Sequence, residues 1–414
     1  MSVADRLREL TPMALALLFA AAMFTLAAPH SLGAPWLLGL LAVLALVWVA
    51  LQPPSTARDD TLPALAVVIA ALGVLVVARL SPDLAAKQLL WLAFSLVLVL
   101  AAGPAFTRFR VLSAYTYVWI VVAIVLFVAL ALFGQEVNGA KLWIRIGGAQ
   151  FEPVEVIKLL VVLFMASYLA GTADVIERTK PWSLRANAKY LGPLFIGWGV
   201  SMAILVLERD VGMAMLLLST FAAMLYVATR RVDLIVGCTA IFAAAMWFAA
   251  THFHYVQARI AVWHDPFRDP YGAGYQAMQS LFSLAAGGLF GTGYHAGRPD
   301  FIPDVATDYV YAAYTEEWGA VGAIVLCAAF LALILRMLVV AQRQPDLYAK
   351  LLATGLAATL GFQVVIIVGG VLRLFPLTGI TLPFVSYGGS SLVTNFLLVA
   401  LVWAISGERR RTTE

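Results

Sequence analysis

Long apolar runs alternate with short polar stretches along almost the whole chain. A helix needs about 20 mainly apolar residues to cross the hydrocarbon core of a bilayer. The runs predict about twelve such spans, which lie at 11–28, 34–51, 62–80, 89–106, 117–134, 154–171, 191–207, 212–229, 233–251, 316–340, 349–372 and 380–406. The pattern therefore predicts an all-α polytopic membrane protein.

One polar interruption is much longer than the others. Residues 252–312 are rich in glycine and aromatic side chains, with acids beside bases. Loops this long are uncommon and are usually functional or disordered. Because this one holds too many aromatic and apolar residues for a disordered segment, we expect it to carry an active site.

Composition supports the membrane assignment. Of 414 residues, 63% are hydrophobic and only 12% are charged, against roughly 25% charged in an average soluble protein. So little polar surface excludes a soluble globular particle of this size. The two cysteines, Cys238 and Cys327, both lie inside apolar runs. They are expected to be packing residues and not a disulfide or a metal site.

The placement of lysine and arginine predicts the orientation, because cytoplasmic loops carry an excess of both. The basic residues that decide it precede the first span or follow the fourth, sixth, eighth, tenth and twelfth spans, which places them all on one side of the membrane. They are Arg6, Arg8, Arg108, Arg110, Arg178, Lys180, Arg185, Lys189, Arg230, Arg231, Arg343, Lys350, Arg409, Arg410 and Arg411. Both termini, including the basic tail 407–414, are then cytoplasmic. The 135–153 loop, the turn at Asp210 and the 252–312 loop face outward.

Two groups of residues near the outer face suit an anionic lipid substrate. Lys141 and Arg145 flank Trp143 in the first of these loops, and cations beside an indole suit a lipid-linked phosphate; an ordinary interfacial anchor is the alternative. Glu155 and Lys158 share a helix face at i and i+3. Charges inside a membrane are costly and are expected to face the bundle interior and mark a cavity.

Asp210 is the candidate third member of the second group. The alternative is that Glu155 and Lys158 form a purely structural ion pair.

The long loop ends in a set of acids. Asp308, with Asp304 nearby, lies at the membrane edge. A partly apolar pocket there would raise the pKa of its carboxyl and suit it to act as a general base. Neighbouring acids also suit a divalent cation such as Mg²⁺ or Mn²⁺, with Asp308 and Asp304 as candidate ligands; no other cofactor is expected. Capping of the next helix is the alternative. In the last span, Ser386 and Ser390 lie in a Gly- and Pro-rich segment that either packs helices closely or exposes backbone to a cavity.

These motifs together carry a family resemblance. The segments that carry it are Asn138–Ile144, Phe151–Lys158, Arg209–Gly212, Asp265–Gln276, Gly287–Gly293, Pro303–Tyr309, Glu316–Gly319 and Pro376–Ser391. In this order they resemble the SEDS family of peptidoglycan glycosyltransferases, of RodA, FtsW and SpoVE type, with RodA-like favoured. The departures, such as Val154 for a usual serine, Asp304 for glutamate and Tyr309 for phenylalanine, remove no proposed catalytic group.

The resemblance implies an architecture and a set of site residues. Residues 62–406 would form a ten-helix membrane core, with two extra helices in 1–61. The family's essential loop aspartate corresponds to Asp308 and its conserved tryptophan to Trp143. Its membrane acid and lysine correspond to Glu155 and Lys158, and its turn acid to Asp210.

The resemblance also implies an activity. The expected reaction is polymerisation of lipid II into glycan on undecaprenyl pyrophosphate, with a new β-1,4 bond formed by inversion. Asp308 would deprotonate the acceptor hydroxyl. The leaving pyrophosphate would need a cation, for which Lys141, Arg145, Arg259 and Arg298 are the candidates.

The expected partner is a class B penicillin-binding protein with a single transmembrane helix, in the bacterial plasma membrane; no nucleic acid is expected. A lipid II flippase and an inert scaffold of the wall-building machinery are the alternatives.

Overall fold

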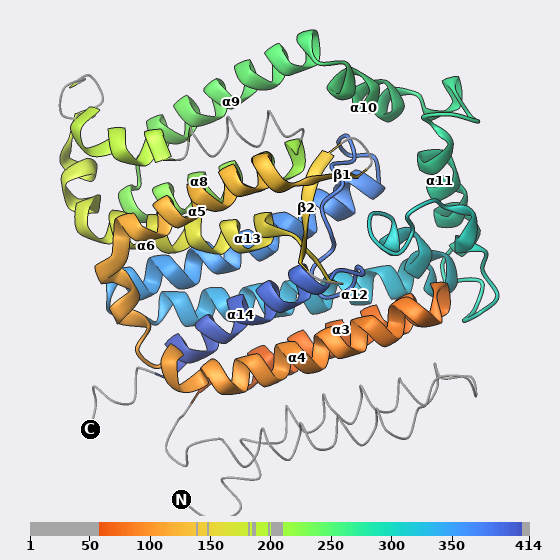
Figure 1. The fold of residues 1–414 in the computed structure, drawn as a ribbon, viewed down its shortest axis with the longest axis horizontal. Coiled ribbons are helices and arrows are strands. Elements are labelled where there is room, and N and C mark those ends of the chain that lie inside the picture. The colour runs from red at the N-terminus through yellow and green to blue at the C-terminus, as the bar shows by residue number, and fades with distance from the viewer. Residues whose placement is uncertain are drawn as a thin grey trace, which may run out of the picture. The chain divides into compact units, whose positions relative to one another are not determined.

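The computed structural model describes residues 58–137, 140–146, 149–180, 183, 188–197, 199 and 210–407. In this part of the chain, nine helices are long and apolar enough to cross a membrane. They are α3 (Thr61–Leu80), α4 (Pro82–Phe106), α5 (Thr116–Phe133), α6 (Pro153–Arg178), α8 (Val211–Thr229), α9 (Val232–His252), α12 (Val310–Gln342), α13 (Leu347–Val371) and α14 (Gly389–Ser406) (Figure 1). The predicted class is confirmed, and these helices match nine of the predicted spans.

The remaining predictions concern other residues. The predicted spans 11–28 and 34–51 and most of the basic tail lie outside the described residues, and 191–207 lies partly outside them. By their contacts, the described residues form two compact units. The first takes in residues up to Phe109, Pro270–Val340 and those from Ile380 on; the second comprises Arg110–Asp269 and Ala341–Gly379.

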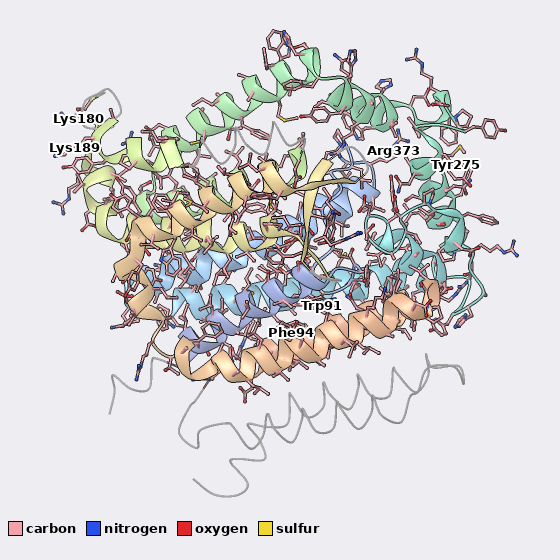
Figure 2. The ribbon with its side chains drawn as sticks, viewed as in Figure 1. Trp91, Phe94, Lys180, Lys189, Tyr275 and Arg373 are labelled. Carbon is pink, nitrogen blue, oxygen red and sulfur yellow. The ribbon has the colours of Figure 1, made fainter. Side chains whose placement is uncertain are left out.

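In the first unit, α3, α4 and α14 pack against one another. Proline at the first position of α4 sets its start, because its missing N–H is not needed there. Gly389 lets α14 begin directly against α4: a Cβ there would lie 2.3 Å from the Trp91 ring. Trp91 meets Phe94 edge to face on the same helix, with ring centroids 5.9 Å apart (Figure 2).

The second half of the 252–312 loop is bonded to a kink in α12. Gly319 has a φ of 68°, and the helix kinks there. The segment after α11 (Tyr275–Gly287) pairs with this kink: the N–H of Ala320 donates to Gly288 O at 2.9 Å, and the N–H of Gly293 donates to Glu317 O at 3.1 Å. Gly291 and Gly319 permit the approach, since a Cβ on either would overlap the other segment's backbone.

In the second unit, α13 packs against α6 and α8, and α5 packs against α6. Gly355 allows close packing of α13, because a Cβ there would overlap Met224 and Val162. By contrast, only 11% of the 18-residue apolar window of α9 is buried.

A small antiparallel sheet in the second unit was not predicted from the sequence. It consists of β1 (Gln135–Val137), β2 (Ala140–Ile146) and β3 (Ala149–Phe151), in the order β1-β2-β3. Gln135 pairs with Trp143, and Ile144 pairs with Phe151. Strands of three to seven residues between two apolar spans leave little periodic signal, which explains the omission.

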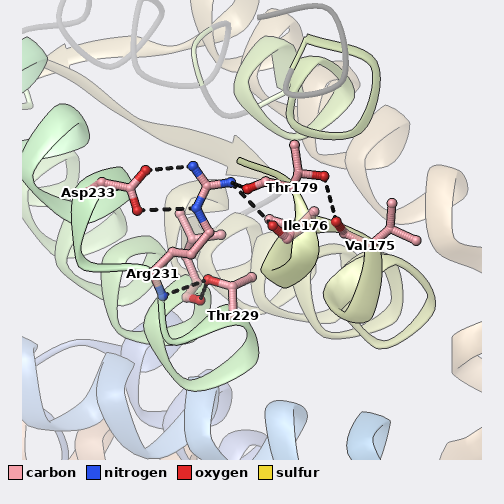
Figure 3. A network of polar contacts seen from close by, with 7 residues as sticks. Val175, Ile176, Thr179, Thr229, Arg231 and Asp233 are labelled. Atoms are coloured by element: carbon pink, nitrogen blue, oxygen red, sulfur yellow. Dashed lines mark hydrogen bonds and ion pairs between the residues drawn. The ribbon is translucent and has the colours of Figure 1, made fainter. Parts of the chain in front are cut away.

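An arginine closes the end of α6. The guanidinium of Arg231 donates to the carbonyls of Ile176 and Thr179 at 3.2 and 3.0 Å, and pairs with the Asp233 carboxylate at 2.5 Å (Figure 3). The last carbonyls of a helix lack partners within it, and a cation there also interacts favourably with the helix dipole. Arg231 thus fixes the α8–α9 turn to the C-terminus of α6.

The predicted loop 252–312 is largely ordered into short helices. Its first part forms α10 (His254–His264) and the turn Pro266–Arg268 in the second unit, and its second part forms α11 and the turn Pro299–Phe301 in the first. The predicted span 380–406 is helical only from Gly389. Residues 380–388, hereafter the strap, form turns, with Phe384 at a φ of 64°.

Candidate functional site

The second unit contains a buried charge cluster at the start of α6. Lys158 Nζ lies 2.5 Å from Glu155 Oε2, and both side chains are at most 2% exposed. The ammonium also donates to Gln363 Oε1 of α13 at 2.8 Å. The i,i+3 spacing therefore produces the expected pair, and α13 supplies a third polar group that the sequence analysis did not identify.

Asp210 lies at the start of α8 and is 6% exposed. Its Oδ1 accepts from the Met213 N–H at 2.9 Å, so it caps the helix. Burial raises the pKa of this carboxyl; the hydrogen bond from Met213 and the charge of Arg259 act against the rise, and the charge of Glu155 adds to it. Asp210 therefore belongs to the same electrostatic cluster as Glu155, as the sequence suggested, and it also brings in Arg259.

The position of Arg259 is set by the contacts of α10. Arg259 Nη1 donates to Thr378 O at 3.1 Å. One turn later, Trp263 Nε1 donates to Arg373 O at 3.0 Å, and the Arg373 guanidinium donates back to Trp263 O at 2.5 Å. These bonds tie the loop helix to the segment after α13. Among the candidate cations whose side chains the structure describes, Arg259 is the one whose charge lowers the pKa of Asp210.

The sheet carries the indole and two of the other candidate cations. Trp143, Arg145 and Lys141 all lie on β2. The Trp143 side chain is half-buried and that of Arg145 is exposed, while the side chain of Lys141 is outside the described residues. Alternation along a strand puts the side chains of Trp143 and Arg145 on one face. Their position on one strand gives the predicted group a physical basis.

Asp308 lies in the first unit, at the end of a tight turn before α12. The N–H groups of Thr307 and Asp308 both donate to Asp304 O, at 3.1 and 3.2 Å. Asp304 has a φ of 48°, which is uncommon outside glycine. Asp308 is half-buried and Asp304 is exposed. Burial, and then the neighbouring Asp308 charge, raise the pKa of the Tyr309 phenol, which keeps it neutral beside the carboxylate.

The strap is hydrogen-bonded to the turn that carries Asp308. The Tyr387 N–H donates to Ala306 O at 2.8 Å, and Ser386 Oγ donates to Thr307 O at 2.5 Å. Ser386 Oγ also accepts from the Leu382 N–H at 2.9 Å. Ser386, predicted to contact substrate, is therefore engaged with the backbone beside Asp308, and Ser390 is buried in the first turn of α14.

The acids that follow in α12 have partners of their own. Arg79 of α3 pairs with Glu317 Oε1 at 2.7 Å and donates to Gly297 O at 2.8 Å. Glu316 Oε1 accepts from the Arg298 N–H at 2.7 Å. These contacts fix the loop after α11 to the kink of α12. The side chain of Arg298, a candidate cation, is exposed and lies over Phe301.

A divalent cation was one expectation for the acids of the loop. Among the described residues, no group of three or more His, Cys, Asp or Glu side chains is arranged to hold a metal ion. Asp304 and Asp308 alone would leave most of the six positions around Mg²⁺ to water or substrate oxygens. Within the described part of the chain, these donors thus do not make up a complete metal site.

Three polar residues escaped the sequence analysis although a signal was present. Gln88, Gln363 and Arg79 all lie within predicted spans or at their ends, and Gln88 and Gln363 are completely buried. Polar side chains inside membrane helices are by default candidates for function. The rule that selects Glu155 and Lys158 therefore also points to Arg79 and to the two glutamines.

Comparison with known proteins identifies the family of the chain. Residues 61–411 match the FtsW/RodA/SpoVE family model, described as cell cycle protein. The chain is 39% identical over 336 residues to the peptidoglycan glycosyltransferase RodA of Mycobacterium tuberculosis, covering 78% of this chain and 71% of that protein. Stage V sporulation protein E of Bacillus subtilis is 32% identical over 275 residues, which cover 66% and 73%.

Solved structures give the same result. The crystal structure of the rod shape determining protein RodA of Thermus thermophilus is similar, with a TM-score of 0.61 and 27% identity, covering 86% of this chain and 99% of that one. A chain of a peptidoglycan synthase complex that coordinates polymerization and crosslinking has a TM-score of 0.68 and 28% identity, covering 86% and 99%.

Proposed function

The chain belongs to the FtsW/RodA/SpoVE family, and on that premise we propose that it is a peptidoglycan glycosyltransferase that polymerises lipid II. The donor is a glycan chain on undecaprenyl pyrophosphate, and the acceptor is lipid II. The acceptor hydroxyl attacks the anomeric carbon of the donor, the lipid pyrophosphate leaves, and inversion gives a β-1,4 bond.

We propose Asp308 as the general base. The observation that carries this role is its setting: a half-buried carboxylate on a turn whose backbone is bonded both to itself and to the strap. A base must be held within hydrogen-bond reach of the proton that it removes. Fixed backbone on both sides of the turn favours such positioning over a mobile loop.

In the second unit, we propose that the charge cluster binds the anionic headgroup of the lipid substrate. A leaving pyrophosphate needs cationic stabilisation. The Arg259 guanidinium donates to Thr378 O, and its charge lowers the pKa of Asp210. Lys158 is completely buried in its pair with Glu155. We therefore propose that Arg259 binds the pyrophosphate and that Trp143 and Arg145 of β2 contact the headgroup. Glu155, Lys158 and Asp210 would line the same binding region.

A divalent cation is not part of the proposed mechanism, because the described residues provide no complete site for one. The partner that we propose is a class B penicillin-binding protein with a single transmembrane helix, in keeping with the similarity to a chain of a peptidoglycan synthase complex. The protein is a multi-pass membrane protein. We propose that its termini are cytoplasmic and that Asp308 faces outward, following the lysine and arginine distribution.

The test is to supply the purified protein, with and without the partner, with lipid II in liposomes. Products are separated on a gel, and movement of fluorescent lipid II across the bilayer is followed in parallel. Glycan polymer is the expected result. Translocation of lipid II without polymer would replace the proposal with a flippase, and neither activity in the presence of the partner would favour a scaffold.

A further inference from the structure

We propose that Gln88 is a positioning residue for the glycosyl transfer: it sets the orientation of Asp308 through the strap. The assignment rests on the proposed role of Asp308 as general base. Gln88 lies on α4 and its side chain is completely buried. None of the sequence motifs that carry the family resemblance contains it.

The Gln88 carboxamide makes two opposite bonds to one short piece of backbone. Its Nε2 donates to Ser386 O at 3.1 Å, and its Oε1 accepts from the Gly388 N–H at 3.2 Å. A terminal amide is one of the few side chains that present a donor and an acceptor side by side. Both atoms are used here, and they fix the backbone on either side of Tyr387.

The same backbone fixes the turn that carries Asp308. Ser386 Oγ donates to Thr307 O at 2.5 Å, and the Tyr387 N–H donates to Ala306 O at 2.8 Å. The carbonyl of Thr307 belongs to the peptide unit that joins Thr307 to Asp308, and that unit is planar. Holding this oxygen therefore fixes the plane from which the Asp308 Cα and side chain project.

The strap needs such support because part of its backbone is strained. Phe384 has a φ of 64°, which for a bulky residue persists only where the surroundings enforce it. The backbone at Phe384 and Val385 lies against α3, where a Cβ on Gly73 would come within 2.5 Å of it. Contact with Gly73 gives the strap a surface to rest on, but Gln88 supplies directed bonds that select one orientation.

The simpler reading is that Gln88 only satisfies buried backbone groups. That reading predicts lower stability without a selective loss of turnover. Positioning predicts a loss of kcat in protein that remains folded, because a misplacement of about 1 Å near the reacting atoms can cost about 10²-fold in rate. The split between kcat and KM separates the two, since Gln88 reaches Asp308 only through the strap.

The experiment compares polymerisation of lipid II by wild type, Gln88→Met, Gln88→Asn and Ser95→Ala in liposomes with the partner. Gln88→Met keeps the length of the side chain without the two bonds. Gln88→Asn keeps an amide but is too short to span both groups, and it carries the test if the methionine variant does not fold. Ser95→Ala is the matched control, because Ser95 is buried on the same helix and its Oγ bonds to Trp91 O of that helix.

We expect kcat to fall at least about 10-fold in both Gln88 variants, with KM for lipid II changed by no more than about twofold, and wild-type rates for Ser95→Ala. Folded Gln88 variants with wild-type kcat would overturn the assignment, as would an equal loss in Ser95→Ala. Asp308→Asn is measured beside them. If it keeps its activity, Asp308 is not the general base. If it is inactive while the Gln88 variants are fully active, only the role of Gln88 is overturned. Wild type that makes no polymer overturns the proposed function and this assignment together.

Discussion

Lys158 and Glu155 form a salt bridge of 2.5 Å in which neither side chain is more than 2% exposed. Removing one partner of a buried pair leaves an uncompensated charge and costs about 3–5 kcal/mol. We therefore expect Lys158→Met and Glu155→Leu to lower the free energy of unfolding by about that amount each. The double variant should be much closer to wild type, because well-packed apolar residues often replace a buried pair at little cost.

Thermal unfolding of the four proteins in detergent measures this cycle. Additive losses in the double variant would show that the two side chains do not act as a pair. Loss of lipid II binding in a double variant that is as stable as wild type would assign the pair to substrate, and unchanged binding would leave it a structural element of α6.

The pKa of Asp210 predicts a pH dependence. Burial raises it, so the folded protein keeps this proton at pH values where the unfolded chain has released it. Stability contributed by the neutral acid is therefore greatest below the unfolded pKa of about 3.9 and is lost as the pH rises to the folded pKa. In Asp210→Asn this loss is absent, and its Tm should fall less than that of wild type over this window.

A control separates charge from capping at the same position. Asn caps a helix about as well as Asp, whereas Ala costs about 0.5–2 kcal/mol. Asp210→Ala should share the flatter pH profile of Asp210→Asn but start from a lower Tm. Parallel Tm profiles for wild type and both variants would contradict the raised pKa.

The bonds of Arg231 predict a local effect at the end of α6. Hydrogen bonds to charged groups contribute about 1.5–3 kcal/mol, so Arg231→Met should destabilise the protein by about that amount. Arg231→Lys should recover only part, because an ammonium cannot reproduce the planar fork that serves two carbonyls and a carboxylate. Hydrogen exchange of residues 170–178 should rise with the loss in Tm.

The neighbouring exposed arginine serves as the control for Arg231. Arg230→Met removes the same charge as Arg231→Met but should leave both Tm and exchange in α6 unchanged, because the Arg230 side chain is exposed. Equal effects at the two positions would mean that net charge, and not the contacts with Ile176 and Thr179, stabilises this end of the helix.

Metal removal should leave the fold intact. Since the described residues offer no group of three or more metal-binding side chains, we expect EDTA to change the Tm of the substrate-free protein by less than the error of the measurement. A clear fall in Tm that Mg²⁺ or Mn²⁺ reverses would reveal a resident ion and would contradict this account of the acids at Asp304 and Asp308.

The sequence predicts the helices well because each membrane span needs its own apolar run, and it predicts the Glu155–Lys158 pair because i,i+3 geometry is local. It does not predict the sheet, whose strands of three to seven residues leave no clear periodicity. Nor does it predict the bonds from Gln88 to Ser386 and Gly388, which join residues about 300 positions apart. Such contacts depend on tertiary packing, and only the buried amide itself hinted at them.

The central claim is that Asp308 is the general base of a lipid II polymerase. It is tested most directly by the initial rates of glycan formation by wild type and Asp308→Asn, each reconstituted with the partner. The two proteins must have the same Tm, so that a loss of rate does not reflect unfolding. A positioned base contributes typically about 10²–10⁴-fold, so the account predicts a loss of at least about 10²-fold in the asparagine variant. A folded Asp308→Asn protein that retains most of the wild-type rate would contradict it.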